Sequence, residues 1–153
     1  MLQGWTNLCI LCLAFIVLYI SLNDQFSSDM DTLDIKATND TPRVILDPAS
    51  NIFEISGRSL PEDVVIFYQP ILDWLEEYQS QPNSNTEFVF KYIYFNTATS
   101  KLIQDILIVL ENLHESGKPV KVLWYHERDD EDMYDLGLEF KENVSIPFDI
   151  IAY

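Results

Sequence analysis

Four small polar residues that could carry chemistry lie together where a strand-like run meets a helix-like run. The stretch YFNTATSKLIQDIL, residues 94–107, passes from aromatic residues to an apolar helical repeat through Asn96, Thr97, Thr99 and Ser100. Side chains of this kind at such a turn suit four roles: a nucleophile, a phosphate-binding loop, a helix cap, or a hydroxyl that is itself modified. The rest of the chain has to distinguish between them.

Catalysis by one of these hydroxyls would need a base within hydrogen-bonding reach, and the chain has only His114 and His126 as imidazoles. His114 falls in the last turn of the expected helix, about 24 Å from its start, where it is more simply a partner for the helix dipole. His126 ends a strand beside acidic residues, and we expect it to be solvated. Phosphate-binding loops use glycine, which this turn lacks. Of the four roles, a helix cap beside an exposed hydroxyl is the one that remains. A phosphate attached to that hydroxyl would lie near the free N–H groups of the helix start.

A second candidate site is the acidic run at residues 127–132. Its carboxylates could bind a divalent cation, and a metal-dependent hydrolase using Asp129, Asp130 and Asp132 with His126 as base is the alternative function. The run lacks the glycine and the terminal spacing of an EF-hand loop. Blocks of like charge usually face solvent, so a solvated loop is favoured over a metal site, and we expect no cofactor.

Composition narrows the class of partner. The 153 residues are 48% apolar and carry a net charge of −16, a field that repels nucleic acid. Both cysteines, Cys9 and Cys12, lie in the apolar N-terminal run, so a disulfide, a zinc–thiolate site or a thiol nucleophile is not expected after it.

Two interpretations of the N-terminal segment stay open. Residues 5–22 are apolar over about the length that crosses a bilayer, which indicates a signal-anchor. Alternatively, Met30 is the true start and residues 1–29 are upstream sequence read in frame. The nearest basic residues, Lys36 and Arg43, follow the segment and favour a cytoplasmic domain. We therefore expect a cytoplasmic protein, or a membrane-anchored one if residues 5–22 are a real anchor.

Residues 43–79 predict a hairpin followed by a helix. Short strands at 43–47 and 51–56 flank DPAS, a turn sequence. Ser59, three residues before Glu62 and with Pro61 between them, resembles a helix cap. Pro70 should kink the helix or break it in two. One helical face is expected to hold Val64, Tyr68, Ile71, Leu75 and Tyr78.

The remaining elements alternate. Residues 86–95 read as a central strand, and an apolar helix follows it and ends at Gly117. Residues 118–127 form another strand, 128–143 a charged loop leading into a helix, and 144–153 a terminal strand or extended tail. This order predicts a single-domain α/β sandwich at 43–153 with a mixed sheet of four to five strands, preceded by a polar lead at 30–42.

The ordered motifs GRSLPED, FYQP, YFNT and WYHERDDEDM, together with the closing SIPF, resemble the SiaC family of bacterial regulatory phosphoproteins. The resemblance covers about residues 35–151. It implies a STAS-like or anti-sigma-antagonist-like fold and a non-enzymatic switch phosphorylated by a cognate kinase and dephosphorylated by a PP2C-type phosphatase. In the studied system the switch controls a diguanylate cyclase. Family members also begin near ATNDTP, which favours Met30 as the start.

The resemblance also implies a phosphorylation site. The family's acceptor is the Thr directly after the Asn of its NTSS motif, which is Thr97 here. This chain has Ala98 and Thr99 in place of the two serines, so Thr99 and Ser100 are secondary candidates. The expected partner-binding surface comprises Asn96, Thr97, Ala98, Thr99, Lys101, Asp129 and Asp130.

Overall fold

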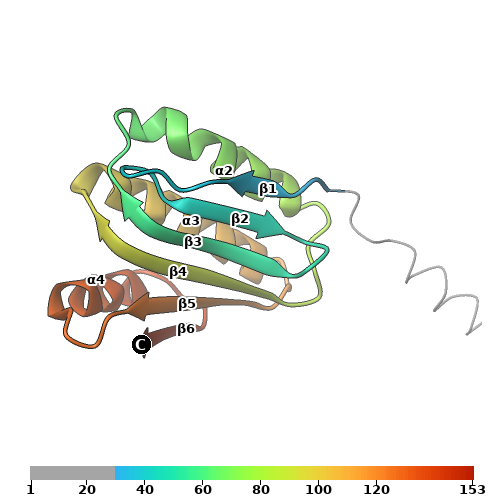
Figure 1. Ribbon diagram of the computed structural model, residues 1–153. Coiled ribbons are helices and arrows are strands. Elements are labelled where there is room, and N and C mark those ends of the chain that lie inside the picture. The colour runs from blue at the N-terminus through green and yellow to red at the C-terminus, as the bar shows by residue number, and fades with distance from the viewer. Residues whose placement is uncertain (1–29) are drawn as a thin grey trace, which may run out of the picture.

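A single six-stranded sheet organises the protein, whose computed structural model describes residues 30–153 (Figure 1). The strands are β1 (Leu33–Ile35), β2 (Arg43–Asp47), β3 (Ile52–Ser59), β4 (Thr86–Phe95), β5 (Val120–His126) and β6 (Phe148–Ala152); the helices are α2 (Val64–Tyr78), α3 (Thr97–Glu115) and α4 (Glu131–Glu142). The sheet order is β1-β2-β3-β4-β5-β6, antiparallel from β1 to β3 and parallel from β3 to β6. The mixed α/β class is confirmed, with more strands than the four to five expected.

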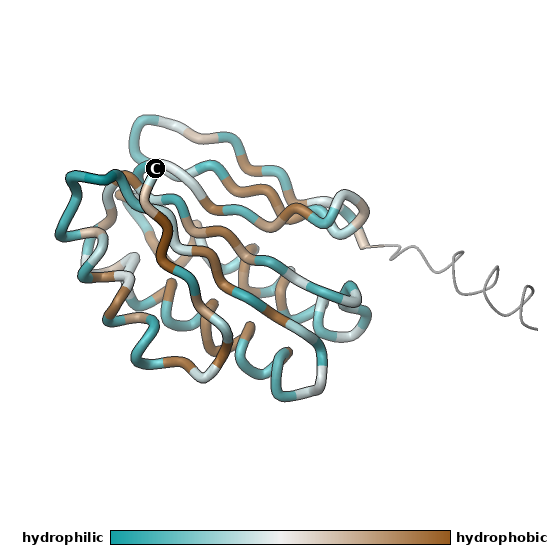
Figure 2. Tube along the Cα trace, turned by 90° about the horizontal axis from the view of Figure 1, so that it is seen from below, coloured by the Kyte–Doolittle hydropathy of each residue, from teal (hydrophilic) through white to brown (hydrophobic). Residues whose placement is uncertain are grey.

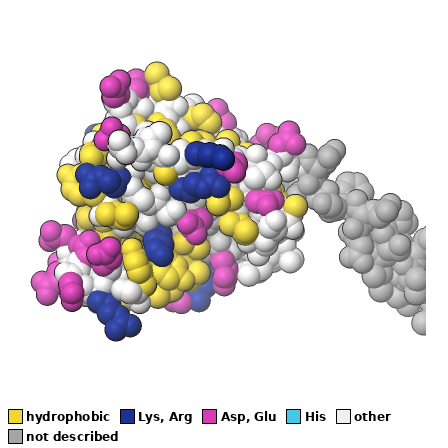
Figure 3. Space-filling view, in the orientation of Figure 1, with side chains coloured by type: hydrophobic (Ala, Val, Ile, Leu, Met, Phe, Trp, Pro, Cys, Tyr) yellow, Lys and Arg dark blue, Asp and Glu magenta, His cyan; other side chains and the backbone are white. Residues whose placement is uncertain are grey.

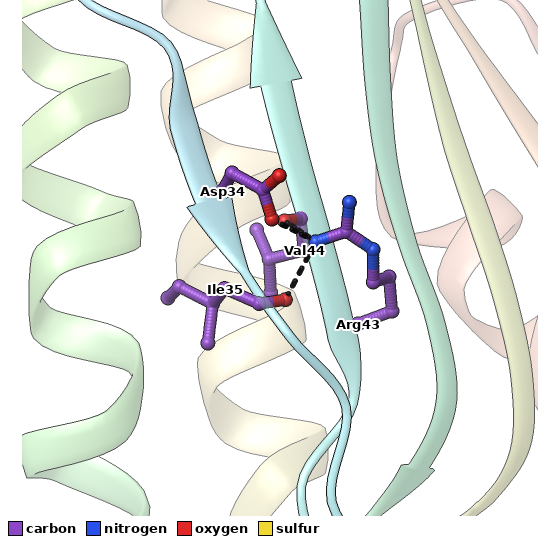
Figure 4. Close-up of polar contacts among 4 residues, drawn as sticks. All are labelled: Asp34, Ile35, Arg43 and Val44. Atoms are coloured by element: carbon purple, nitrogen blue, oxygen red, sulfur yellow. Dashed lines mark hydrogen bonds and ion pairs between the residues drawn. The ribbon is translucent and has the colours of Figure 1, made fainter.

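The additional strand lies in the polar lead. Residues 33–35 pair antiparallel with β2, and Arg43 holds the pair together. Its guanidinium donates to the Asp34 carboxylate and to the backbone carbonyls of Ile35, at 3.1 Å, and Val44, at 3.4 Å (Figure 4). Three residues are too few to give a visible alternation of apolar and polar side chains, so the sequence pattern did not reveal this strand.

All three helices cover one face of the sheet (Figure 2). Alternate side chains of the central strands point toward them, and they form one aromatic-rich core in which Trp124 contacts Phe90, Phe95 and Phe140. The helix α4 packs so closely that a Cβ added at Gly137 would lie 2.6 Å from Trp124 Cδ1. The molecule is therefore two layers, helices on sheet, with the second sheet face uncovered within residues 30–153.

The helix α2 departs from two expectations. It begins after Asp63, whose carboxylate accepts from the Ile66 N–H at 3.0 Å, whereas Ser59 ends β3 and is buried, so the predicted Ser59 cap is wrong. Of the kink or break expected at Pro70, the break does not occur, because the helix is continuous from Val64 to Tyr78. Tyr68 and Ile71, on either side of the exposed proline, are both buried, and this packing outweighs the hydrogen bond that proline cannot donate.

Other predictions are confirmed. The helix α3 buries the expected apolar repeat, and Gly117 follows its end with a positive φ of 89°.

Among the described residues no helix is long and apolar enough to span a bilayer. The proposed anchor at 5–22, and the rest of residues 1–29, lie outside that range.

Candidate functional site

Three helices begin at the same edge of the sheet. Because β3, β4 and β5 run parallel, the helices that follow them, α2, α3 and α4, all present their N-termini there (Figure 1). Each helix is capped by the side chain that precedes it: Asp63, Asn96 and Asp130 accept from the N–H groups of Ile66, Thr99 and Met133 at 2.9–3.0 Å. This edge contains the predicted turn and the predicted acidic loop.

The cap of α3 differs from the other two. Asp63 and Asp130 are carboxylates, and α4 adds Glu131 and Asp132 in its first turn. Asn96 is neutral, and the first turn of α3 contains no acidic residue. Of the three helices, α3 is therefore the one whose cap and first turn place no negative charge at the positive end of the helix dipole.

Thr97 is the first residue of α3, and its side chain is exposed. Ala98 and Lys101 are exposed as well, whereas Asn96 and Ser100 are half-buried. The backbone is fixed here by the Asn96 cap and by a bond from the Ser100 N–H to the Asn96 carbonyl at 3.0 Å. The turn thus offers one exposed threonine hydroxyl on an ordered helix start.

Thr99 has a different environment from its neighbours. It is fully buried, and its hydroxyl lies 3.0 Å from the Ser59 hydroxyl and 3.2 Å from the Ser59 carbonyl. The Ser59 hydroxyl also contacts Tyr68 at 2.8 Å, and the Tyr68 hydroxyl contacts Tyr92 at 3.0 Å. The structure therefore does not present Thr99 to a partner or to a kinase, although it adjoins the residues that are exposed.

This buried chain of four hydroxyls joins the end of β3 to α2, β4 and α3. If each hydroxyl donates once, in the order Tyr92, Tyr68, Ser59, Thr99 and then the Ser59 carbonyl, every proton is used. Burial raises the pKa of Tyr68, and burial followed by the neighbouring Tyr68 raises that of Tyr92. The phenols stay neutral, so the chain acts as a structural tie beneath Thr97.

The sequence contained a signal for the buried hydroxyl chain, although the family motifs do not point to it. Thr99 stands four residues before Ile103 and seven before Ile106, which places it on the buried stripe of α3. Ser59 gave no comparable signal, because its resemblance to a helix cap pointed elsewhere.

The acidic loop follows β5, which neighbours β4, and so lies at the same edge as the turn. Asp129 is exposed, and Asp130 is half-buried and engaged in capping α4. Five acidic side chains line an open hollow of about 420 Å³: Glu127, Asp129, Asp130, Glu131 and Asp132. Nowhere in residues 30–153 do three carboxylate, imidazole or thiol groups converge in a way that could hold a metal ion. That geometry gives the alternative hydrolase no support.

Neither histidine forms a hydrogen bond with a hydroxyl group of the turn. His126 is buried rather than solvated, because its ring packs 5.3 Å from that of Tyr134 and its Nδ1 lies 2.8 Å from the Glu127 carbonyl. His114 lies in the last turn of α3, and its Nδ1 accepts from the Val120 N–H at 3.4 Å. Both imidazoles are occupied by structural contacts.

Two apolar residues at this edge were not among the partner-binding residues expected from the sequence. Val65 and Ile66, in the first turn of α2, are exposed, and Ile66 is 72% exposed. They lie off the buried face of α2 formed by Tyr68, Ile71 and Leu75, which was their signal in the sequence. An exposed aliphatic pair beside a capped, hydroxyl-bearing turn is suited to contact with another protein.

Comparison with known proteins agrees with this description. The family model for "SiaC family regulatory phosphoprotein" matches residues 35–153. An uncharacterized protein of Pseudomonas aeruginosa is 32% identical over 124 residues, which is 81% of this chain and 98% of that protein.

Solved structures of the same fold also match. Apo-SiaC from Pseudomonas aeruginosa has 32% identity and a TM-score of 0.74, over 80% of this chain and all of that one. SiaC in a crystal structure with the diguanylate cyclase SiaD, of which it is described as the activator, has 32% identity and a TM-score of 0.75, over 79% of this chain and 99% of that one.

Proposed function

We propose that this chain, which belongs to the SiaC family of regulatory phosphoproteins, is a binding switch whose docking surface is controlled by phosphorylation of Thr97. As a member of that family it is a regulatory protein rather than an enzyme. The observation that carries the proposal is the exposed Thr97 hydroxyl at the start of α3. Among the three helices described at this edge, α3 is the one with a neutral cap and no acidic first turn.

Electrostatics explain how one phosphate would act as a switch. A phosphate on Thr97 adds nearly two negative charges and three acceptor oxygens. The uncompensated N-terminus of α3 would stabilise that charge locally, so the helix start would persist. The same charge would join an edge that already carries Asp63 and Asp129, and a partner fitted to the unmodified edge would be repelled.

The partner-binding surface that we propose comprises Asn96, Thr97, Ala98 and Lys101 at the turn and Asp129 and Asp130 in the acidic loop. Thr99 contributes by holding α3 against β3 from below. Exposed Val65 and Ile66 add an apolar contact at the same edge.

We propose three classes of partner. By analogy with the SiaC–SiaD complex, we propose a diguanylate cyclase as the regulated protein. A protein kinase and a PP2C-type phosphatase would add and remove the phosphate. A switch that meets these partners and their nucleotide substrates would act in the cytoplasm.

Phosphosite mapping tests the acceptor. The protein is purified from its own organism, or incubated with the cognate kinase and ATP, and the modified residue is identified by mass spectrometry. Thr97→Ala should abolish phosphorylation, whereas Thr97→Ser, which keeps a hydroxyl at the same place, should retain it. Ser100→Ala is the matched control and should leave labelling unchanged. Undiminished labelling of Thr97→Ala would assign the modification to another residue.

A further inference from the structure

The uncovered face of the sheet gathers basic and aromatic side chains at one end. Strand register places Arg43, Ser56 and Lys91 side by side across β2, β3 and β4. The Lys91 ammonium also lies 5.9 Å from the centroid of the Tyr125 ring on β5. Arg58 and Tyr94 pair in the next row, beyond a register shift. Lys and Arg side chains are visible on this face among hydrophobic ones (Figure 3).

Two of these cations rest on aromatic rings. The Lys91 ammonium lies 4.1 Å from the centroid of the Tyr153 ring, and the Arg58 guanidinium lies 5.5 Å from that of Tyr94. Within residues 30–153 the ion pairs are Arg43 with Asp34 and Lys121 with Asp149, so neither Lys91 nor Arg58 has a carboxylate partner there. Both cations are therefore held in place on aromatic rings, and their charge is available to pair with a ligand.

A hollow of about 350 Å³ is lined by Lys91 and Tyr153, whereas Arg58 and Tyr94 are not part of its lining but directly follow the lining residues Gly57 and Ile93 in the chain. Ser56 and Gly57 form part of its lining with Arg43, Lys91, Ile93 and Tyr153. Gly57 has a φ of 101°, and a Cβ there would meet nothing within 4 Å, so the space above the strand is open. Ile93 is 54% exposed, and Tyr94 and Tyr153 are exposed beside it. The one carboxylate in the lining is Glu54, one row further along β3.

We propose that this basic–aromatic hollow binds an acidic, aliphatic segment of a partner protein. Carboxylates would pair with Lys91 in the hollow and with Arg58 beside it, and aliphatic side chains would cover Ile93 and the tyrosine rings. In a chain of net charge −16 these fixed cations are an exception that suits an acidic ligand. A second copy is disfavoured as occupant because two such chains repel each other. The lining of the hollow contains no residue of the Thr97 turn, and we expect binding there not to depend on phosphorylation.

Peptide titration followed by NMR tests this proposal. The probe is an end-blocked hexapeptide of alternating Glu and Val, compared with a peptide in which Gln replaces Glu. The amides of Ser56, Gly57, Lys91 and Ile93 should shift with the Glu peptide and not with the Gln peptide. The double variant Lys91→Gln/Arg58→Gln should bind about fivefold more weakly. Lys118→Gln, which removes an exposed cation from a loop, is the matched control and should bind as the wild type does.

The remaining outcomes contradict the proposal. They are no shift at millimolar Glu peptide, equal response to both peptides, undiminished affinity in the double variant, or shifts at the hollow that depend on protein concentration without peptide, which would identify a second copy as the occupant. Spectra of the variants that match the wild type away from this face establish that they fold. Thr97→Glu should bind the peptide normally, so a failure here and a failure of the phosphorylation switch are distinguishable.

Discussion

The hydroxyl of Thr99 lies 3.0 Å from that of Ser59, and this contact ties the first turn of α3 to the end of β3. Thr97, two residues earlier, points to solvent. The same short turn thus contains a residue that fixes the backbone and a residue that other proteins could reach, and the predictions below separate the two.

Thr99→Val should destabilise the protein by about 1–3 kcal/mol, because it removes the Thr99 partner of the buried Ser59 hydroxyl, which keeps only its contact with Tyr68, and the Thr99 donor to the Ser59 carbonyl, while conserving side-chain volume. Denaturant unfolding measures the change. Thr97→Val is the matched control at an exposed site and should alter stability by less than about 0.5 kcal/mol. Equal losses of stability in the two variants would contradict the assignment of Thr99 as the structural residue and Thr97 as the exposed one.

Asn96→Ala should cost about 1 kcal/mol, because the Thr99 N–H loses its cap. Asn96→Asp should instead stabilise the unmodified protein by about 0.3–1 kcal/mol, because it places a negative charge at the uncompensated end of the α3 dipole. The gain should shrink in high salt. A destabilised Asp variant would argue that this helix end does not favour an anion.

Gly137→Ala tests the close packing of α4 on the sheet. The added Cβ would meet the Trp124 ring, and we expect a loss of about 1–3 kcal/mol even though alanine favours helix by about 1 kcal/mol. Fluorescence should report the displaced indole, which donates to the Met133 carbonyl at 3.0 Å. Glu139→Ala, at an exposed position of the same helix, should leave both stability and fluorescence unchanged.

Alkaline pH should weaken the fold through the buried phenols. The pKa values of Tyr68 and Tyr92 are raised in the folded state, so their contribution is complete below the unfolded pKa of about 10. Above that pH the unfolded chain releases protons that the folded chain keeps, and stability falls as pH rises toward the folded values. Unfolding free energies measured on both sides of pH 10 should show this decline. Tyr92→Phe should reduce the decline, whereas Tyr94→Phe, at an exposed ring, should not.

Much of this arrangement follows from local pattern. The strand at 86–95 and the helix that buries Ile103 and Leu110 have clear periodicity, and their bounds agree with the structure. The misassigned features depend on long-range contacts instead. Ser59 resembled a cap, yet its hydroxyl bonds to Tyr68 and Thr99, nine and forty residues away. Pro70 indicated a kink or a break, and tertiary packing keeps the helix unbroken.

The candidate site divides in the same way. The Asn96 cap is predictable from residue type and position. The contrast between that neutral cap and the acidic caps Asp63 and Asp130 becomes visible only when the parallel strands bring the three helix starts to one edge. The proposed role of Thr97 as a phosphate acceptor comes from the family resemblance, because exposure alone does not distinguish a modified threonine from any other.

The most direct test of the central claim measures binding of a diguanylate cyclase from the same organism to two forms of this protein, one unmodified and one carrying phosphothreonine incorporated at position 97. Thr97→Val serves as a third sample that lacks the hydroxyl without adding charge. The account predicts that the unmodified protein and Thr97→Val bind alike and that the phosphorylated protein binds at least about tenfold more weakly, a loss of about 1.4 kcal/mol. Equal or tighter binding by the phosphorylated form would contradict it.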